Sequence, residues 1–452
     1  MKLFGTDGLR GRAGEFPLDP PSMRKIGHEL GRRLAEGPSP IVVVGGDTRL
    51  STPEIVGQLA AGIVEGGGSV ASGGVLPTPA VAELVQELSA GAGVSVSASH
   101  NPWEDNGIKI FGADGRKWPD RDEESLEAAL FASRAEAAGR QELFAGTAAP
   151  APDAGLSRLY LDRLSRSVAA RLDGLHLVID AGNGAAFRLG PEALRRAGAR
   201  VSPIHDTPDG RNINEGCGAL HPEGMGSAVR ESGASFGVAY DGDADRSIFA
   251  DETGRILDGD DILWIIASDW KRKGVLPAGG VVGTVMSNFG LEAALAREGI
   301  AFRRSAVGDR NVARLMEETG ASIGGETSGH VLLPFSPAGD AILTTLLVAS
   351  IVTESGEPLS RLATLKKVPQ SLRNVRVSRR VALEDVPSLV SAMRDARERL
   401  GSRGRILVRY SGTEPLLRIL VEGQDADEVA AVARGIEDAV RAELVFAGSA
   451  TR

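Results

Sequence analysis

The sequence has a single cysteine, Cys217, among its 452 residues, so it can form no internal disulfide. A chain without a disulfide framework fits a reducing compartment. The opening residues, MKLFGTDGLRGRAG, have no apolar signal core, and the longest near-apolar run, residues 341–352, is too short to span a bilayer. We therefore expect a cytoplasmic, soluble protein with no membrane partner.

Basic residues are outnumbered by acidic ones. The chain has 51 Lys and Arg against 60 Asp and Glu, which gives a formal net charge of −9. A nucleic-acid-binding surface normally carries a basic patch, so we expect no nucleic-acid partner. A site for a small anionic substrate can still be locally basic in an acidic protein. The length suggests about three domains of roughly 150 residues.

Three well-known catalytic signatures are missing. No Walker lysine accompanies a glycine-rich loop, which argues against a P-loop enzyme, and no G-x-G-x-x-G with a downstream ribose-binding acid follows a strand, which argues against a dinucleotide fold. Ser99 is followed directly by His100, but it lacks the G-x-S-x-G elbow of a serine hydrolase. Neighbouring side chains on a loop also rarely face each other.

Apolar strand-like runs alternate with helical periods through most of the chain. Strand-like runs occur at residues 41–45, 93–97, 175–180, 236–240 and 281–285, and helix-like segments follow them. Such alternation predicts α/β domains with parallel sheets. From residue 372 the pattern changes to β-α-β-β-α, which predicts a small α+β domain.

Four polar loops follow the predicted strands, where ligands bind in open α/β sheets. In the first, at residues 99–102, Ser99 could belong to an ordinary Ser/Asn turn or could carry a phosphoryl group held by backbone N–H groups. In the second, Asp241, Asp243 and Asp245 offer the oxygen ligands that Mg²⁺ prefers, and Arg246 suits a phosphate beside the metal. An acidic surface turn is the alternative.

The third and fourth loops suit a phosphorylated sugar. Residues 324–330 combine glycines with a carboxylate, two hydroxyls and an imidazole, which can bind a polyhydroxyl ligand, although a flexible connection has a similar composition. Residues 409–415 combine Arg, Ser, Gly and Thr, which can hold an anion through a forked donor and backbone N–H groups. A β-hairpin turn is the alternative.

The order of five stretches closely resembles the α-D-phosphohexomutase family, and the resemblance covers essentially the whole chain. These stretches are FGTDGLRG (4–11), SASHNP (97–102), DGDADR (241–246), GETSGH (325–330) and SGTEP (411–415). The FGTDG opening, GRNINEGCG at 210–218 and VGDR at 307–310 are most similar to the members that act on glucosamine phosphates.

The resemblance implies an α/β fold with four domains around a central cleft. Three are duplicated α/β domains with mixed, mostly parallel sheets, and the fourth is a C-terminal α+β domain similar to the TATA-binding protein. The expected boundaries are 1–150 with the phosphoserine loop, 151–252 with the metal loop, 253–368 with the sugar-binding loop, and 369–452 with the phosphate-binding loop.

The resemblance also implies roles for individual residues. Ser99 is expected to be phosphorylated, with one Mg²⁺ held by Asp241, Asp243, Asp245 and the phosphate on Ser99. Lys109 or His330 is expected to assist proton transfer at the reacting end, beside Arg10, whereas His100 is expected to shape the loop. The substrate-binding residues are expected to be Arg246, Glu326, Ser328, Arg409, Ser411, Gly412, Thr413 and Arg418.

The implied activity is that of an intramolecular phosphotransferase, which interconverts glucosamine 6-phosphate and glucosamine 1-phosphate through the 1,6-bisphosphate. Family members are often dimers, so the expected partners are a small phosphosugar and a second copy of the chain. Three alternatives are an enzyme of the same family acting on glucose or mannose phosphates, a serine hydrolase, and a non-catalytic phosphosugar-binding protein.

Overall fold

The computed structural model describes residues 2–5, 7–137, 147–168, 171–411 and 415–445. The chain divides into two compact units, each described by itself below. Unit 1 comprises Met1–Thr284 and Arg303–Thr364, and unit 2 comprises Val285–Phe302 and Leu365–Arg452. Within the described ranges, no helix combines the length and the hydropathy that a membrane crossing requires.

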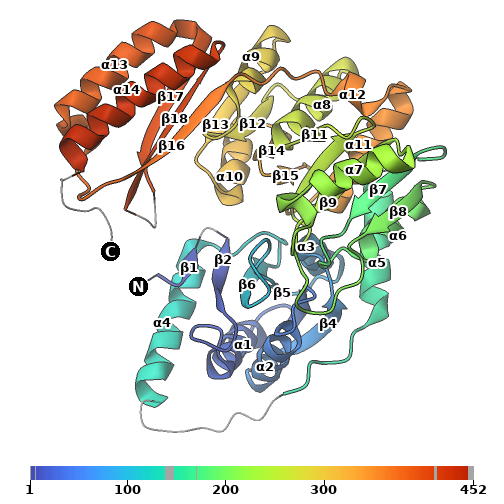
Figure 1. The fold of residues 1–452 in the computed structure, drawn as a ribbon. Helices are drawn as coiled ribbons and strands as arrows, with labels where there is room; N and C mark the ends of the chain where they lie inside the picture. Colours follow the sequence, from blue (N-terminus) through green and yellow to red (C-terminus); the bar gives the residue numbers. More distant parts are fainter. Residues whose placement is uncertain (1, 6, 138–146, 169–170, 412–414, 446–452) are drawn as a thin grey trace. The chain divides into compact units, whose positions relative to one another are not determined.

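One order of elements occurs three times along the chain: strand, helix, strand, helix and then two consecutive strands (Figure 1). The first copy consists of β3 (Ile41–Gly46), α2 (Thr52–Glu65), β4 (Ser69–Val75), α3 (Thr78–Glu87), β5 (Ala92–Val96) and β6 (Asp105–Gly112). The second consists of β7 (His176–Asp180), α6 (Leu189–Arg196), β8 (Arg200–Ile204), α7 (Glu223–Ser232), β9 (Phe236–Tyr240) and β10 (Ser247–Asp251). The third consists of β12 (Val281–Thr284), α9 (Phe289–Arg297), β13 (Phe302–Ser305), α10 (Asp309–Thr319), β14 (Ile323–Gly325) and β15 (Val331–Leu332).

The three copies also share one strand order within their sheets. The sheets run β1-β2-β6-β5-β3-β4, β11-β10-β9-β7-β8 and β13-β12-β14-β15. In the first two, the opening strand of the copy pairs in parallel with two neighbours, and the last two strands pair antiparallel. The expected mixed sheets of duplicated α/β domains are therefore confirmed.

The remaining elements of unit 1 extend or cover these sheets. They are β1 (Phe4–Gly5), β2 (Gly8–Arg12), α1 (Pro20–Ala35), α4 (Asp120–Ala137), α5 (Ala154–Ser167), the 3₁₀ turn η1 (Gly218–Leu220), β11 (Ile256–Leu257), α8 (Gly259–Arg272), α11 (Ala341–Ser355) and α12 (Leu359–Leu362).

Local sequence explains where these elements form. Every residue of β5, β7 and β9 is buried, as expected for strands whose two faces are both covered, and their apolar runs are nearly continuous. Several helices begin at side-chain caps: the carboxylate of Asp19 accepts from the Ser22 amide, and that of Asp340 from the Leu343 amide. Asp258 starts α8 with a capping box.

Unit 2 is built on a three-stranded antiparallel sheet in the order β16-β18-β17. Its elements are β16 (Gln370–Arg376), η2 (Leu383–Asp385), α13 (Pro387–Leu400), η3 (Gly401–Arg403), β17 (Gly404–Tyr410), β18 (Leu416–Gly423) and α14 (Ala426–Leu444), together with α9. Ile419 and Val421 of β18 share one apolar core with Val432 and Ile436 of α14. This arrangement confirms the predicted β-α-β-β-α order.

All four polar loops join antiparallel neighbours. The loop with Ser99 connects β5 to β6, the aspartate loop connects β9 to β10, residues 326–330 connect β14 to β15, and residues 411–415 connect β17 to β18. The sequence indicated the strand before each of the first two loops and both strands around the fourth, but neither strand beside the third loop and not the returning strands of the first two. The functional side chains are therefore placed at the ends of paired strands rather than on free crossover loops.

Candidate active site

Ser99 lies three residues beyond β5 and is fully buried. Its φ angle of 53° falls in the left-handed region, which costs a non-glycine residue about 1–2 kcal/mol. Hydrogen bonds hold its backbone in place. The Ser99 amide donates to Ser97 Oγ at 2.9 Å, and its carbonyl accepts from Arg49 Nη2 at 2.9 Å and from Asn214 Nδ2 at 3.0 Å. The loop is thus fixed by its surroundings in a conformation it would not adopt alone.

Arg49 holds this loop in place through hydrogen bonds to its main chain. Its side chain is completely buried, and its Nε donates to Asp47 Oδ2 at 2.8 Å. The two terminal nitrogens donate to four main-chain carbonyls of the loop, those of Ser99, Asn101, Pro102 and Asp105. Arg49 and Asp47 were not predicted as site residues, although the polar GDTR stretch directly at the end of a buried strand was a signal.

The hydroxyl of Ser99 points at the aspartate loop rather than at a base. Ser99 Oγ donates to Asp241 Oδ2 at 2.6 Å, whereas His100 Nδ1 lies 3.4 Å from Oγ. Arg246 Nη1 lies 3.0 Å from His100 Nδ1, so this nitrogen is the acceptor for a guanidinium. Burial and the charges of Arg246 and Arg10 lower the pKa of His100. The geometry favours a neutral, loop-shaping His100 and gives no Ser–His pair of the hydrolase type.

Three carboxylates converge beside Ser99. Asp241, Asp243 and Asp245 are all buried, and one oxygen from each lies within 4.8 Å of the others. Lys109 Nζ donates to Asp243 Oδ2 at 2.8 Å and to Asp245 Oδ2 at 2.7 Å. Among the described residues, the buried atoms Asp243 Oδ1 and Asp245 Oδ1 have no hydrogen-bond partner. Clustered hard oxygens of this kind fit a divalent cation such as Mg²⁺.

The first turn of α3 orients one of these carboxylates. Thr78 Oγ1 donates to Asp243 Oδ2 at 2.7 Å, and the Thr78 amide donates to the Asp243 carbonyl at 3.0 Å. Ser95 Oγ lies 2.7 Å from the Thr78 hydroxyl. Partners of this kind fix the direction of a metal-binding carboxylate.

The titratable groups of this cluster have pKa values that are shifted in different directions. Burial, with Asp245 and Asp243 nearby, raises the pKa of Asp241 well above its usual range. Burial acts the same way on Asp245, but Lys109, His330 and Arg246 together outweigh it and hold the pKa of Asp245 well below its usual range. The pKa of Lys109 is raised well above its usual range, because the carboxylates outweigh the effect of burial. Lys109 therefore stays protonated and supplies positive charge.

A second layer of charges surrounds the triad on the side of the first sheet. Asp7, between β1 and β2, accepts from Lys117 Nζ at 2.6 Å and lies 3.3 Å from Lys109 Nζ. Arg10 of β2 pairs with Asp7, and its Nη1 donates to Asn101 Oδ1 at 3.2 Å in the serine loop. Arg10 and Lys109 are thus placed beside Ser99, as predicted, whereas Asp7 and Lys117 were not predicted.

His330 joins the same network from the third sheet. Its Nδ1 lies 3.6 Å from Asp245 Oδ1, and its Nε2 lies 3.9 Å from Asp309 Oδ2, which also pairs with Lys117 Nζ at 2.6 Å. His330 is fully enclosed, and burial opposes its protonation, but the charges of Asp245 and Asp309 raise its pKa. Glu326 accepts from the Gly308 amide at 2.8 Å through Oε1. Ser328, two residues beyond it, is exposed.

The predicted phosphate-binding residues lie in unit 2. Arg409 of β17 and Arg418 of β18 are directly opposite each other in the antiparallel register. Like charges in this position repel, so the pair is well suited to share an anion. Ser411 is buried, and its carbonyl accepts from Arg380 Nη2 at 2.6 Å. Gly412 and Thr413 lie outside the described residues.

Unit 1 therefore brings most of the predicted catalytic and metal-binding residues into one network. It holds Ser99, His100, Arg10, Lys109, Arg246, His330, Asp241, Asp243 and Asp245. The residues that were missed are polar groups whose partners are distant in sequence. Asp7 and Asp309 fall within the FGTDG and VGDR stretches, so those stretches contained a usable signal.

Comparison with known proteins agrees with this fold. The four domains of the phosphoglucomutase/phosphomannomutase family match consecutive parts of the chain: alpha/beta/alpha domains I, II and III at residues 1–137, 158–254 and 258–368, and the C-terminal domain at residues 372–439. A phosphoglucomutase/phosphomannomutase family protein from Burkholderia thailandensis has the same fold, with a TM-score of 0.80 and 24% identity, covering 98% of this chain and 99% of that one. The class is that of the four-domain phosphohexomutases.

Relatives that match over nearly their full length indicate a more specific similarity within this class. Phosphoglucosamine mutase from Alkalilimnicola ehrlichii is 44% identical over 453 residues, covering 97% of each chain. Phosphoglucosamine mutase from Symbiobacterium thermophilum is also 44% identical, over 98% of this chain and 99% of that one. This chain belongs to the phosphoglucomutase/phosphomannomutase family. The exact domain boundaries expected from the sequence stay predictions.

Proposed function

We propose that this protein interconverts glucosamine 6-phosphate and glucosamine 1-phosphate through a phosphorylated Ser99. The observation that carries the proposal is the 2.6 Å hydrogen bond between Ser99 Oγ and Asp241, at the edge of a buried triad of carboxylates. A serine that only shaped a turn would not need three buried acids beside it. Full-length similarity to phosphoglucosamine mutases supports the amino sugar as substrate.

The triad is proposed to hold one Mg²⁺, together with the phosphate on Ser99. When bound, the ion would neutralise charge on the transferring phosphoryl group. Two buried oxygens in the triad without a hydrogen-bond partner among the described residues, Asp243 Oδ1 and Asp245 Oδ1, support this assignment. Thr78 would keep the Asp243 carboxylate aimed at the ion through its 2.7 Å hydrogen bond.

The reaction proceeds by two transfers that balance each other. The phosphorus–oxygen bond to Ser99 breaks as O1 of glucosamine 6-phosphate bonds to phosphorus and loses its proton. The resulting 1,6-bisphosphate turns around, and its 6-phosphoryl group returns to Ser99 Oγ while O6 regains a proton. Phosphoryl transfer depends mainly on in-line positioning and charge neutralisation, which Arg10 and protonated Lys109 provide.

Proton transfer falls to His330 rather than Lys109. The carboxylates around Lys109 raise its pKa well above the usual range, so it holds its proton at neutral pH. The pKa of His330 is also raised, but it starts from the imidazole range close to neutrality. Glu326 and Ser328 are proposed to hold sugar hydroxyls, and Arg409, Ser411, Gly412, Thr413 and Arg418 the phosphate that does not react.

In the cell, this activity would supply glucosamine 1-phosphate for UDP-N-acetylglucosamine and cell-wall precursors. We propose that the protein acts in the cytoplasm as a homodimer. Because relatives in the family also act on glucose and mannose phosphates, the amino-sugar preference needs its own measurement. A difference in one sugar substituent is worth about 1–3 kcal/mol unless buried polar groups read it.

The test compares kcat/KM for glucosamine 6-phosphate, glucose 6-phosphate and mannose 6-phosphate, using phosphorylated enzyme and Mg²⁺. We expect a preference for the amino sugar of at least about tenfold. Equal or better use of glucose or mannose 6-phosphate would move the enzyme to general hexose-phosphate metabolism. In parallel, Ser99→Ala should nearly abolish turnover with the fold intact; wild-type turnover by this variant without added bisphosphate would overturn the phosphoserine mechanism.

A further inference from the structure

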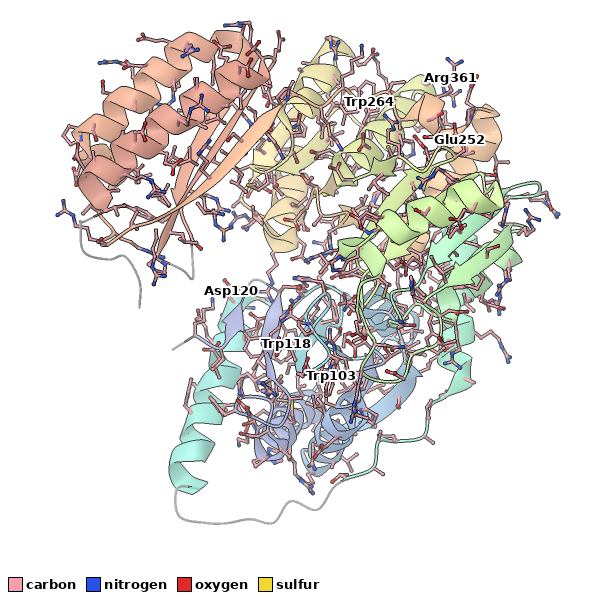
Figure 2. All side chains as sticks on the ribbon, in the orientation of Figure 1. Trp103, Trp118, Asp120, Glu252, Trp264 and Arg361 are labelled. Atoms are coloured by element: carbon pink, nitrogen blue, oxygen red, sulfur yellow. The ribbon has the colours of Figure 1, made fainter. Side chains whose placement is uncertain are left out.

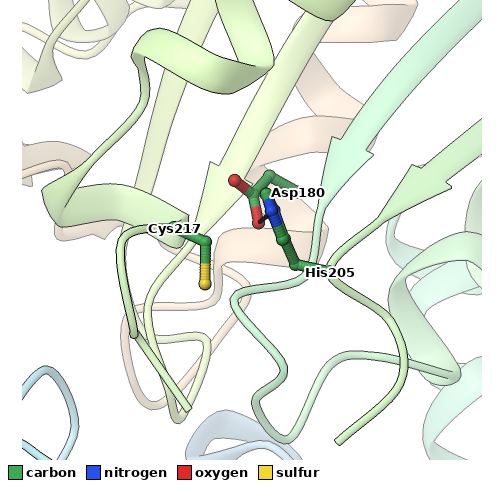
Figure 3. A group of neighbouring side chains, drawn as sticks. All are labelled: Asp180, His205 and Cys217. Atoms are coloured by element: carbon green, nitrogen blue, oxygen red, sulfur yellow. Dashed lines mark ion pairs between the residues drawn. The ribbon is translucent and has the colours of Figure 1, made fainter. Parts of the chain in front are cut away.

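A second group of metal-ligand side chains lies in the second α/β copy, outside the network described above. Asp180 is the last residue of β7, His205 follows β8 directly, and Cys217 lies in the loop before η1 (Figure 3). One ligand atom from each lies within 4.8 Å of the other two. Because β7 and β8 are parallel neighbours, their carboxyl ends bring Asp180 and His205 to the same edge of the sheet.

The carboxylate of Asp180 is already oriented. The Gly182 amide donates to Oδ1 at 2.9 Å, and the Gly218 amide donates to Oδ2 at 3.0 Å. Carboxylates that bind metals are held by hydrogen bonds of this kind. His205 Nδ1 lies 3.0 Å from Asp180 Oδ1, so the imidazole and the carboxylate face each other.

Cys217 is placed as a ligand rather than as a reactive thiol. It is completely buried, and burial together with Asp180 and Glu215 raises the pKa of its thiol to about 12. Because the thiolate is the form that binds metal, binding of Zn²⁺ at this sulfur would release the thiol proton. Asn183 Nδ2 lies 4.0 Å from Sγ and can stabilise charge on the sulfur.

We propose that Asp180, His205 and Cys217 bind a Zn²⁺ ion. Carboxylate, imidazole and thiolate together are a donor set for zinc, whereas Mg²⁺ prefers oxygen ligands only. Zinc–ligand bonds of about 2.0–2.3 Å place the donor atoms of a tetrahedral site about 3.3–3.8 Å apart. The three donor atoms lie within 4.8 Å of one another, and His205 Nδ1 is 3.0 Å from Asp180 Oδ1. Because the His205 side chain is 40% exposed, water can reach the site and supply a fourth ligand.

A bound Zn²⁺ would stabilise the loop between His205 and Cys217, which also contacts the serine loop. Between His205 and Cys217, Asn214 donates to the Ser99 carbonyl at 3.0 Å. The Arg211 guanidinium lies over the ring of Trp103, at 5.3 Å from its centroid, and Trp103 is labelled in Figure 2. Zinc should therefore stabilise unit 1 against unfolding, and its effect on the reaction should be indirect.

The experiment uses the full chain, freed of metal by a chelator and then titrated with ZnCl₂ in competition with a chromogenic chelator. We expect one tightly bound Zn²⁺ per chain in the presence of excess Mg²⁺, which occupies the aspartate triad. Co²⁺ bound in its place should give a sulfur-to-cobalt charge-transfer band, and thermal unfolding should move to higher temperature when zinc is added.

Four variants separate this site from other binding. His205→Ala and Cys217→Ser should each weaken zinc binding at least about tenfold and remove the thermal shift. His221→Ala, which removes an exposed histidine nearby in sequence, should leave both unchanged. Asp243→Asn should also leave zinc binding unchanged, because it alters only the triad.

Two results would overturn the proposal. One is the absence of a bound zinc at equimolar concentration in the wild-type protein, a measurement that needs no variant to fold. The other is zinc binding of equal strength in His205→Ala, whose exposed side chain can be removed with little risk to the fold. In either case Asp180 and His205 form only a structural hydrogen bond over a buried thiol. Neither result bears on the mutase activity, which is measured separately.

Discussion

Replacing Arg49 by methionine tests whether the hydrogen bonds of this side chain hold the serine loop in place, as the structure indicates. The substitution keeps a long apolar stem but removes every hydrogen bond that the Arg49 side chain donates to Asp47 and to four carbonyls of the loop. Removing one partner of a buried ion pair costs about 3–5 kcal/mol. Each buried carbonyl left without a donor costs about 1–3 kcal/mol, partly recovered where water enters. We therefore expect unfolding to become easier by at least about 3 kcal/mol.

Catalysis should suffer even where the variant stays folded. A displacement of the reacting group by about 1 Å can cost about 10²-fold in rate, and Arg49 donates one of the hydrogen bonds that hold Ser99 in its left-handed backbone conformation. Arg49→Lys should give an intermediate loss, because an ammonium group cannot bridge the same four carbonyls.

Two measurements check this account: urea unfolding, and the single-turnover rate of phosphoryl transfer from phosphorylated enzyme to glucosamine 6-phosphate. Arg171→Met serves as the control, because the Arg171–Asp173 pair is exposed and should contribute little to stability. A folded Arg49→Met enzyme with wild-type transfer rate and a stability loss below about 1 kcal/mol would refute the reasoning.

Three further predictions concern single contacts. Thr78→Val should weaken Mg²⁺ binding about 10–100-fold by freeing the Asp243 carboxylate; unchanged affinity in a calorimetric titration contradicts the orienting role. Because the pKa of His330 is raised in the folded protein, its positive charge stabilises the fold below about pH 6.5, and this stabilisation is lost as pH rises through the folded pKa. The difference in the free energy of unfolding between wild type and His330→Gln should therefore be larger at about pH 6 than at about pH 9. Arg409→Ala should raise KM about 10–100-fold by leaving Arg418 as the remaining guanidinium of the pair; an unchanged KM counts against the phosphate grip.

The residues that could be predicted from the sequence are those concentrated in short motifs. Three aspartates within five residues after a strand indicated a metal site, and the structure places them together next to Ser99. The α/β repeats could be predicted for a similar reason, since each buried central strand is a nearly continuous apolar run.

The rest depends on contacts between distant segments. Nothing near Arg49 in the sequence reveals that its guanidinium caps carbonyls more than 50 residues away. Lys117 joins Asp7, between β1 and β2, to Asp309, at the start of α10 in the third α/β copy. The returning strands β6 and β10 also escaped prediction, because the polar residues at their starts resembled loop residues more than strand residues.

The charge balance of the site links Mg²⁺ binding to the phosphorylation of Ser99. The network contains five carboxyl groups, Asp7, Asp241, Asp243, Asp245 and Asp309, among which Asp241 has a strongly raised pKa, and five cationic groups, Arg10, Lys109, Lys117, Arg246 and protonated His330. A phosphate on Ser99 adds about −1.5 to −2 charge in this buried place, which a divalent cation can neutralise.

Without the phosphate, a divalent cation would add positive charge to a network whose carboxylates Lys109 and the neighbouring basic side chains already neutralise. We therefore expect phosphorylated enzyme to bind Mg²⁺ at least about tenfold more tightly than phosphatase-treated enzyme, which corresponds to about 1.4 kcal/mol. Isothermal titration of the two forms measures this difference, with Ser99→Ala as a control that cannot be phosphorylated and should match the treated enzyme. Equal affinities would mean that the three aspartates hold the ion alone and that Lys109 does not compete with it for their oxygens.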